Sequence, residues 1–294
     1  SIAAMQDEMA EWRQDIHAHP ELAFEEVRTA QLVAEKLESW GIEVTRGLGK
    51  TGLVGTLKGR EPGSRSIGLR ADMDALPLQE LNDLPYKSQY DGKMHACGHD
   101  GHTATLLGAA KYLAENPNFK GTVHFIFQPA EEGFAGAKAM IKDGLFERFP
   151  CDEVYGLHNA PHMEFGKIGV MSGPMMAAAD TFDIVVQGRG GHGAFPQTSV
   201  DPVLIGSQIV TALQSIVSRN TDPQKSGVIS VTRFHAGEAF NVIPDTAMLG
   251  GTVRTFDPKV QDMIIERMEA VATGIATALG GSAELRYRRG YPVT

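Results

Sequence analysis

The chain has 294 residues, 42% of them hydrophobic and 21% charged, which is typical of a globular protein with one large domain or two ordinary ones. Its formal net charge of −9 argues against a nucleic-acid-binding protein, because such a protein needs a basic face. Two cysteines are too few for a disulfide framework, and no apolar run approaches the roughly 18 residues of a membrane span.

The first part of the chain alternates between helical and strand-like segments. Residues 25–40 carry apolar side chains at helical spacing and are followed by Gly41, a common residue just after a helix. A second helix, rich in small residues, is predicted from about residue 102 to 115. Strands are predicted at residues 52–57, 66–70, 123–127, 153–157 and 168–171. This alternation is typical of an α/β layer architecture.

From about residue 181 the order of elements becomes β-α-β-β-α-β. The strands are predicted at residues 182–187, 228–234, 247–255 and 283–288, and the helices at residues 201–219 and 258–279. This order is that of a split βαβ, or ferredoxin-like, unit. A stretch of Gly, Pro, Met and Ala at residues 172–179 separates the two patterns. We therefore predict one domain over residues 1–178 and a second over residues 179–290.

Residues 94–102 hold three of the ten histidines and one of the two cysteines. Thiolate and imidazole are the usual protein ligands of zinc and similar ions. The glycine between Cys97 and His99 permits a tight turn, so both side chains could face one ion. His95 and His102 rank below them, because five ligands within nine residues would be crowded. We expect a reducing cytoplasm as the setting, because it would keep the thiol available as a thiolate.

Two predicted strands are followed by further ligand types. Glu131 and Glu132 come after one strand and His158 after another. In an α/β sheet, ligand sites lie beyond the carboxyl ends of the strands. Of two adjacent carboxylates, one can bind a metal while the other acts as a general base on water. Taken alone, two adjacent glutamates more often form an exposed acidic turn, and a single histidine after a strand is more often structural. Their grouping with Cys97 and His99 favours a metal site.

Five further residues are candidates for supporting roles. His192 has glycines on both sides that expose its imidazole, although a flexible hairpin tip would look the same. Asn241 and Arg254 lie in the same predicted domain, and a guanidinium suits a substrate carboxylate, although pairing with a surface carboxylate is more common. Asp72 and Asp74 follow another strand, where one of them could fix the tautomer of a ligand histidine or simply cap a loop.

Six short motifs make the chain resemble the M20 family of metallopeptidases, in which they occur in the same order. They are RADMDALP at residues 70–77, HACGHDGHT at 95–103, FQPAEEG at 127–133, GLHN at 156–159, GGH at 190–192 and NVIP at 241–244. The chain is most similar to the amidohydrolase branch, which includes hippurate hydrolase, N-acyl-amino-acid amidohydrolases and auxin-conjugate hydrolases. The resemblance extends from about residue 19 to the end of the chain.

The resemblance implies a zinc-peptidase-like α/β/α catalytic domain with an inserted ferredoxin-like α+β domain that serves as lid and dimerisation domain. It implies a centre of two divalent ions, which are manganese, zinc or nickel in relatives. The implied ligands are Cys97, His99, Glu132 and His158, with Glu131 as the general base. The implied reaction is hydrolysis of the amide bond of N-acyl amino acids such as hippurate by a metal-activated water.

The second domain would contribute to the same reaction through a homodimer. By the resemblance, His192 would reach the active site of the neighbouring subunit and help to bind the oxyanion. Asn241 and Arg254 would bind the free carboxylate of the small-molecule substrate, and Asp72 and Asp74 would support the ligands from outside. Other possibilities are a dipeptidase or aminoacylase of the same family, a hydrolase with Cys97 as nucleophile, and a catalytically inactive metal- or peptide-binding homologue.

The chain departs from the family pattern in two places. The family's last metal ligand is a histidine in a C-terminal segment that returns to the catalytic domain, and residues 291–294 would begin that return. No histidine follows His235. We therefore expect that the sequence is a fragment that lacks one ligand, which puts its catalytic activity in question. Gln197 stands where many relatives have a histidine, so substrate contacts there would differ.

Overall fold

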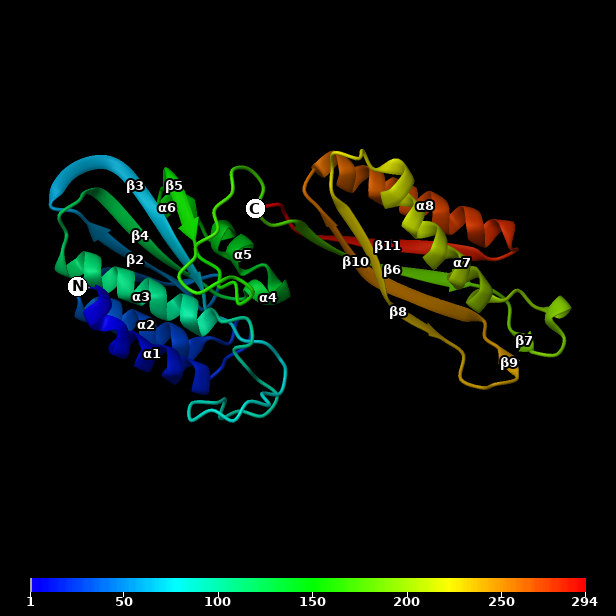
Figure 1. Ribbon diagram of the computed structural model, residues 1–294, viewed down its shortest axis with the longest axis horizontal. Helices are drawn as coiled ribbons and strands as arrows, with labels where there is room; N and C mark the ends of the chain where they lie inside the picture. Colours follow the sequence, from blue (N-terminus) through cyan, green and yellow to red (C-terminus); the bar gives the residue numbers. More distant parts are fainter. Residues whose placement is uncertain (1) are drawn as a thin grey trace. The chain divides into compact units, whose positions relative to one another are not determined.

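The computed structural model describes residues 2–294, which divide by their internal contacts into two units. The first unit ends at Lys167 and the second begins at Ile168, somewhat before the boundary expected from the sequence. Figure 1 shows the helices and strands of each unit, coloured from blue at the N-terminus to red at the C-terminus. Among the described residues, no helix combines the length and the hydropathy needed to cross a membrane.

The first unit is built around a mixed five-stranded sheet with the order β1-β2-β4-β3-β5. The strands are β1 (Glu43–Leu48), β2 (Gly52–Lys58), β3 (Glu61–Asp72), β4 (Lys120–Gln128) and β5 (Glu153–Gly156). β2 is antiparallel to β1 and β4, whereas β3 is parallel to β4 and to β5. The carboxyl ends of β3, β4 and β5 therefore lie at the same edge of the sheet.

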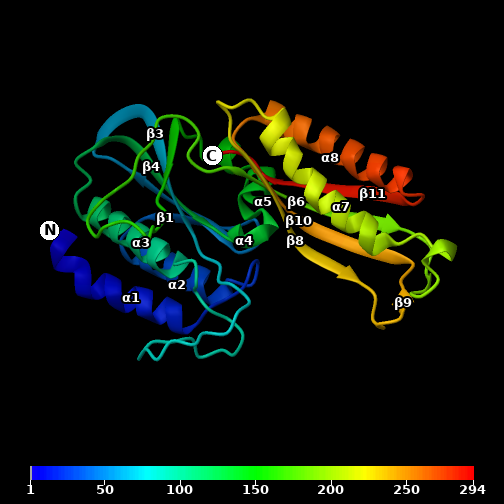
Figure 2. The same cartoon turned by 45° about the vertical axis from the view of Figure 1, so that its right-hand side comes forward.

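Helices cover both faces of this sheet. They are α1 (Gln6–Ala18), α2 (Val27–Ser39), α3 (His99–Glu115), α4 (Glu131–Phe134), α5 (Gly136–Lys142) and α6 (Leu145–Arg148), preceded by a 3₁₀ turn at Ile2–Met5. In Figures 1 and 2, α1, α2 and α3 lie together on one side of the sheet. Leu53 and Phe127 pack towards these three helices, whereas their chain neighbours Val54 and Ile126 pack towards α5 and α6. This alternation of adjacent side chains makes an α/β/α sandwich.

The second unit is an antiparallel four-stranded sheet with two helices. Its elements are β6 (Ala178–Gln187), β7 (Gly191–His192), α7 (Pro202–Ser215), a π turn (Ile216–Asn220), β8 (Gly227–Ala236), β9 (Val242–Ile243), β10 (Thr246–Thr255), α8 (Pro258–Ala278) and β11 (Ser282–Tyr291). The strand order β11-β6-β10-β8 puts the first and third long strands in the centre, as in a ferredoxin-like unit. One core cluster joins the inner face of the sheet to α7 and α8.

Both helices of this unit begin in the same way. Asp201 accepts hydrogen bonds from the backbone of the first turn of α7, and Asp257 does so for α8. In each case a proline occupies the first helical position, where its missing N–H costs nothing.

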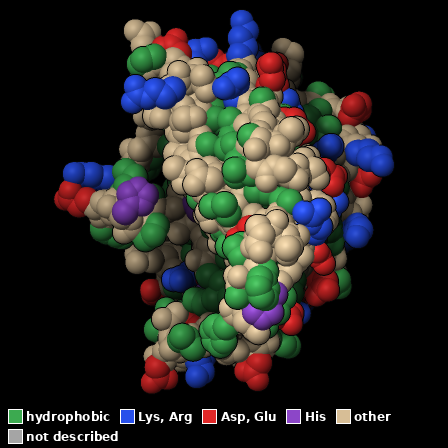
Figure 3. Space-filling model, turned by 90° about the vertical axis from the view of Figure 1, so that its right-hand side faces the viewer, with side chains coloured by type: hydrophobic (Ala, Val, Ile, Leu, Met, Phe, Trp, Pro, Cys, Tyr) green, Lys and Arg blue, Asp and Glu red, His purple; other side chains and the backbone are tan. Residues whose placement is uncertain are grey.

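Figure 3 shows one face of the molecule, on which acidic, basic and hydrophobic side chains are interspersed.

One predicted strand is wrong and three short ones were missed. Residues 168–171 form no strand, and Ile168, Val170 and Met171 are exposed. Their apolar pattern looks strand-like, but a strand also needs a neighbour that accepts its backbone hydrogen bonds, and none of the described residues pairs with this segment. The strands β1, β7 and β9 were not predicted, because they are short or half exposed and carry little apolar periodicity.

Candidate metal centre

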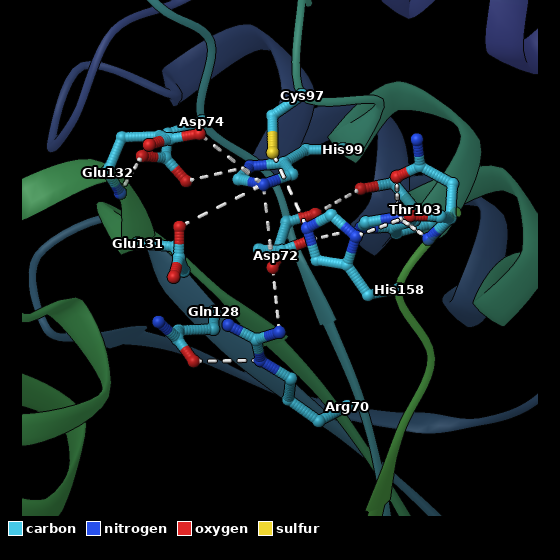
Figure 4. Close-up of polar contacts among 12 residues, drawn as sticks. Arg70, Asp72, Asp74, Cys97, His99, Thr103, Gln128, Glu131, Glu132 and His158 are labelled. Carbon is cyan, nitrogen blue, oxygen red and sulfur yellow. Dashed lines mark hydrogen bonds and ion pairs between the residues drawn. The ribbon is translucent and has the colours of Figure 1, made fainter. Parts of the chain in front are cut away.

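Polar residues from four segments gather beyond the parallel strand ends of the first unit, as Figure 4 shows. Asp72, the last residue of β3, lies opposite Gln128, the last residue of β4. Glu131 and Glu132 follow directly after β4, and His158 follows β5. The fourth segment is the start of α3 with the two residues before it. The shared direction of β3, β4 and β5 therefore brings together residues up to about 90 positions apart in the sequence.

Gly98 allows the tight approach of Cys97 and His99. It is the N-cap of α3 with a φ of 90°, a left-handed conformation that glycine adopts without steric cost. A Cβ at this position would lie 2.9 Å from the side-chain oxygen of Asn159. A glycine here thus permits the start of α3 to pack against the residue after His158. The thiol of Cys97 lies 3.4 Å from Nε2 of His158.

The two histidines at the centre of the cluster are oriented alike. His99 Nδ1 donates to Asp74 Oδ1 at 3.2 Å, and His158 Nδ1 donates to the backbone carbonyl of Asn159 at 2.8 Å. Both rings therefore carry the proton on Nδ1 and turn Nε2 towards the other polar groups. Metal-ligating histidines usually show this pattern, in which a carboxylate or carbonyl holds the nitrogen that does not bind the ion.

His99 is fully buried, and its Nε2 has no hydrogen-bond partner among the described residues. This nitrogen faces three carboxylates, with Asp72 Oδ2 at 3.6 Å, Glu132 Oε1 at 3.9 Å and Glu131 Oε2 at 4.0 Å. Burial by itself lowers the pKa of His99, but the hydrogen bond to Asp74 and the surrounding acidic groups raise it to about 11. The environment therefore strongly favours a positive charge at this position.

This donor set fits divalent metal ions. Three groups of possible ligand atoms, each within 4.8 Å of one another, share His99; they are Cys97/His99/His158, His99/Glu131/Glu132 and Asp72/His99/His102. An unpartnered buried nitrogen beside a thiol, an imidazole and carboxylates offers the mixture of ligands that zinc and related ions take. The four ligands expected from the sequence, Cys97, His99, Glu132 and His158, are all found in the first two groups.

Asp74 links His99 to the two glutamates. One of its oxygens accepts from His99, and the other accepts from the backbone N–H of Glu132 at 2.8 Å. Burial opposes the charge of Asp74, but these hydrogen bonds and one from the Glu131 backbone outweigh it, so its pKa lies below the usual range. Asp74 thus hydrogen-bonds both a candidate ligand histidine and the backbone of a candidate ligand glutamate.

Asp72 and His102 form a second chain of contacts. His102 Nδ1 donates to Asp72 Oδ1 at 2.6 Å, and His102 Nε2 accepts the backbone N–H of Asn159 at 3.0 Å. The other oxygen of Asp72 accepts from Arg70, which also donates to Gln128. Sequence reasoning ranked His102 low and did not consider Arg70, Gln128 or Asn159. The spacing of His99 and His102 on one helix face was the only local signal for this arrangement.

The candidates of the second unit lie at two places within it. His192 on β7 is exposed, and its Nδ1 accepts the backbone N–H of Ala194 at 3.1 Å. Asn241 lies close by, since its backbone carbonyl accepts the N–H of Gly193 at 2.8 Å. Arg254, near the end of β10, donates to the hydroxyl of Thr252 and to a carbonyl of its own strand.

The chain resembles known hydrolases over most of its length. The model of peptidase family M20/M25/M40 matches residues 68–294. The chain is 52% identical over 277 residues to hippurate hydrolase of Campylobacter jejuni, covering 94% of this chain and 72% of that protein. It is 48% identical over 283 residues to an N-acyl-L-amino acid amidohydrolase of Geobacillus stearothermophilus, covering 95% and 75%.

A solved structure of similar fold binds two metal ions. A dinuclear metal-binding peptidase of the M20 family from Bacillus subtilis superimposes with a TM-score of 0.83 at 41% identity, covering 99% of this chain and 76% of that one. This match confirms the α/β fold class, and the ligand groups around His99 together with it support a centre for two divalent ions. The resemblance drawn from the six motifs is confirmed: the chain belongs to peptidase family M20/M25/M40 and is a hydrolase of its amidohydrolase branch.

Proposed function

We propose that the protein hydrolyses the amide bond of N-acyl amino acids, including hippurate-like substrates. The observation that carries this proposal is the position of the Glu131 carboxylate, 4.0 Å from the unpartnered Nε2 of His99, inside a cluster that suits metal ions. The identity to a hippurate hydrolase and to an N-acyl-L-amino acid amidohydrolase supports the substrate class.

Cys97, His99, Glu132 and His158 would hold the ions. Thiolate, imidazole and carboxylate together suit manganese, zinc or nickel. Such ions supply Lewis acidity, which makes water more acidic and polarises a substrate carbonyl. Asp74 keeps the Nε2 of His99 turned towards them, and the carbonyl of Asn159 does the same for His158.

Glu131 is the proposed general base. It takes a proton from the attacking water as the water oxygen bonds to the carbonyl carbon, and it gives that proton to the amine nitrogen as the carbon–nitrogen bond breaks. Burial raises the pKa of Glu131, and the nearby charges of Glu132 and Asp72 raise it further. A raised pKa suits a carboxylate that must hold a proton between the two steps.

The second unit would supply the remaining groups through a homodimer formed by residues 179–290. Because Nδ1 of His192 accepts the N–H of Ala194, the ring proton lies on Nε2 and can be donated to an oxyanion in the partner's active site. One such donor is typically worth ~3 kcal/mol of barrier. Asn241 and Arg254 would bind the substrate carboxylate. We also propose that the protein is located in the cytoplasm, where a reducing environment keeps the Cys97 thiol reduced.

A Glu131→Gln variant tests the role of the base. We expect turnover of hippurate to fall by about 10²- to 10⁴-fold, because the amide cannot accept the proton of water. The amount of bound metal should stay as in the unchanged protein. A matched Glu132→Gln variant should instead lose metal. Hippurate hydrolysis at the full rate in Glu131→Gln would overturn the assignment.

One contact favours a second chemistry. The 3.4 Å approach of Cys97 to His158 resembles the thiol–imidazole pair of cysteine hydrolases, in which the thiolate attacks the carbonyl. Exhaustive chelation separates the two mechanisms. Activity should disappear on chelation and return with added ions if the reaction depends on metal, whereas activity that survives chelation would favour Cys97 as nucleophile.

A further inference from the structure

Glu26 is a buried carboxylate that the proposed reaction does not use. It stands directly before α2, and its exposed fraction is 0%. Its Oε1 accepts the backbone N–H of Ala130 at 2.8 Å, and its Oε2 accepts the hydroxyl of Thr51. A carboxylate is expensive to bury unless its oxygens are hydrogen-bonded. The hydrogen bond from Ala130, 104 residues away, therefore indicates a specific structural role for Glu26.

The partner of Glu26 is an unusual residue. Ala130 adopts the left-handed conformation, with φ 51° and ψ 47°, which is sterically unfavourable for a residue other than glycine. Both of its peptide groups are held, since Glu26 binds its N–H and its carbonyl accepts the N–H of Gly136 at 2.9 Å. This left-handed residue turns the chain sharply at the end of β4, directly before Glu131.

The turn is secured on both sides of Glu131. Glu26 holds the amide of the preceding residue, and Asp74 holds the amide of the following residue at 2.8 Å. Without Glu26, the buried N–H of Ala130 would lose its acceptor, and a buried donor without an acceptor destabilises the conformation that buries it. Relaxation of Ala130 towards the right-handed region would then redirect both glutamates away from His99.

We propose that Glu26 is a positioning residue, whose hydrogen bond to the N–H of Ala130 keeps Glu131 and Glu132 directed towards His99. The inference rests on the proposed role of Glu131 as general base. Glu26 acts through the backbone of the turn, because its side-chain oxygens accept from the N–H of Ala130 and the hydroxyl of Thr51.

Three variants and one control separate this role from general stabilisation. Glu26→Gln keeps an oxygen for Ala130 and places its amide at Thr51, whose hydroxyl can accept. Glu26→Ala removes the acceptor. Glu26→Asp replaces it if the alanine variant does not fold, because the shorter side chain does not reach Ala130. The control is Glu21→Ala, because the Glu21 carboxylate accepts the backbone N–H groups of Arg28 and Thr29 at the same helix start.

Hydrogen–deuterium exchange of the metal-free protein is the first readout. Glu26→Ala should speed exchange of the Ala130 amide at least about tenfold, whereas Glu26→Gln and Glu21→Ala should leave it unchanged. The second readout is hippurate kinetics. Glu26→Ala should lower kcat about 10²-fold with little change in KM, because a misplaced base slows the reaction without altering substrate contacts, and Glu26→Gln should retain kcat within a few-fold.

Two results would overturn the proposal. One is exchange of the Ala130 amide at the unchanged rate in Glu26→Ala. The other is faster exchange with kcat still within twofold of the unchanged protein, which would show that the turn does not need Glu26 to place Glu131. Absence of hippurate hydrolysis in the unchanged protein would count against the proposed function alone, because the exchange measurement tests the contact without any reaction.

Discussion

His99 belongs to every group of possible ligands found among the described residues, so its orientation determines what the site can bind. That orientation comes from Asp74, which accepts from Nδ1 and leaves Nε2 to face the carboxylates of Asp72, Glu131 and Glu132. The same aspartate also holds the amide of Glu132. One side chain thus sets both the tautomer of an imidazole and the position of a carboxylate.

An Asp74→Asn variant should weaken metal binding. Asp74 uses one carboxylate oxygen for His99 and the other for the backbone N–H of Glu132. The asparagine side chain has a single oxygen, so one of these two donors loses its acceptor. Loss of such a supporting carboxylate typically costs about 10- to 100-fold in metal affinity. Calorimetric titration of the metal-free protein with Zn²⁺ or Mn²⁺ measures this change directly.

Asp152→Asn is the matched control, because Asp152 also accepts a backbone N–H, that of Ser66, but lies outside the cluster. It should bind metal as the unchanged protein does. An Asp74→Asn variant that kept its metal dissociation constant within twofold would show that Asp74 does not support the centre.

At the scale of elements, β5 is an unusual part of the first unit. It is an edge strand, paired only with β3 among the described residues, and all four of its residues are exposed. Val154 and Tyr155 are 47% and 54% exposed. An open edge with apolar side chains is a template for pairing with another strand.

Pairing of two β5 edges would give a second contact between chains, separate from the proposed homodimer of residues 179–290, and a Val154→Lys variant should oppose it. A charged lysine on an edge strand disfavours a second strand, and we expect the dissociation constant of this β5 contact to rise about tenfold, equivalent to ~1.4 kcal/mol. Sedimentation velocity over a range of concentrations measures it. Val27→Lys is the control, since Val27 is exposed at the start of α2 and away from any strand edge; an equal effect of both variants would contradict the explanation.

At the scale of the whole molecule, the chain has two units with separate cores. The core of the second unit joins α7 and α8 to its own sheet, and the clusters of the first unit include none of those residues. All four proposed ligands lie in the first unit. Metal binding should therefore stabilise one unit and leave the other unchanged.

Differential scanning calorimetry tests this expectation. Chelation should lower the transition of the first unit, which bound metal stabilises by about 3 kcal/mol at free ion concentrations 100 times the dissociation constant. The transition of the second unit should not move, and a Cys97→Ala variant should show a much smaller effect of chelation. Equal shifts of both transitions would contradict a metal centre confined to the first unit.

Mixing two inactive variants tests the proposed sharing of His192 between subunits. A heterodimer of Glu131→Gln and His192→Ala has one active site with Glu131 of one chain and His192 of the other. If His192 acts on the partner, mixing with subunit exchange should restore about a quarter of the activity of the unchanged protein, since half of the dimers are hybrids with one working site of two. Mixtures that remain inactive would place His192 in its own subunit's reaction or outside it.

The sequence by itself determined most of the elements and the residue types of the proposed site. Hydrophobic periodicity is a local property, so most long helices and strands were predicted, including the β-α-β-β-α-β order of the second unit. The ligand types Cys97, His99, Glu132 and His158 could be proposed because each follows or adjoins a predicted strand end. The family followed from the order of six motifs, which the comparisons confirmed.

Only the tertiary structure decided how these residues are held. The contacts of Asp74 with Glu132, of His102 with Asn159 and of Glu26 with Ala130 span 58, 57 and 104 residues. No local pattern encodes such pairs, because they depend on which strand ends and loops become neighbours once the sheet has formed. For the same reason the segment at residues 168–171 looked like a strand but lacks a pairing neighbour, and the left-handed turn before Glu131 became visible only in three dimensions.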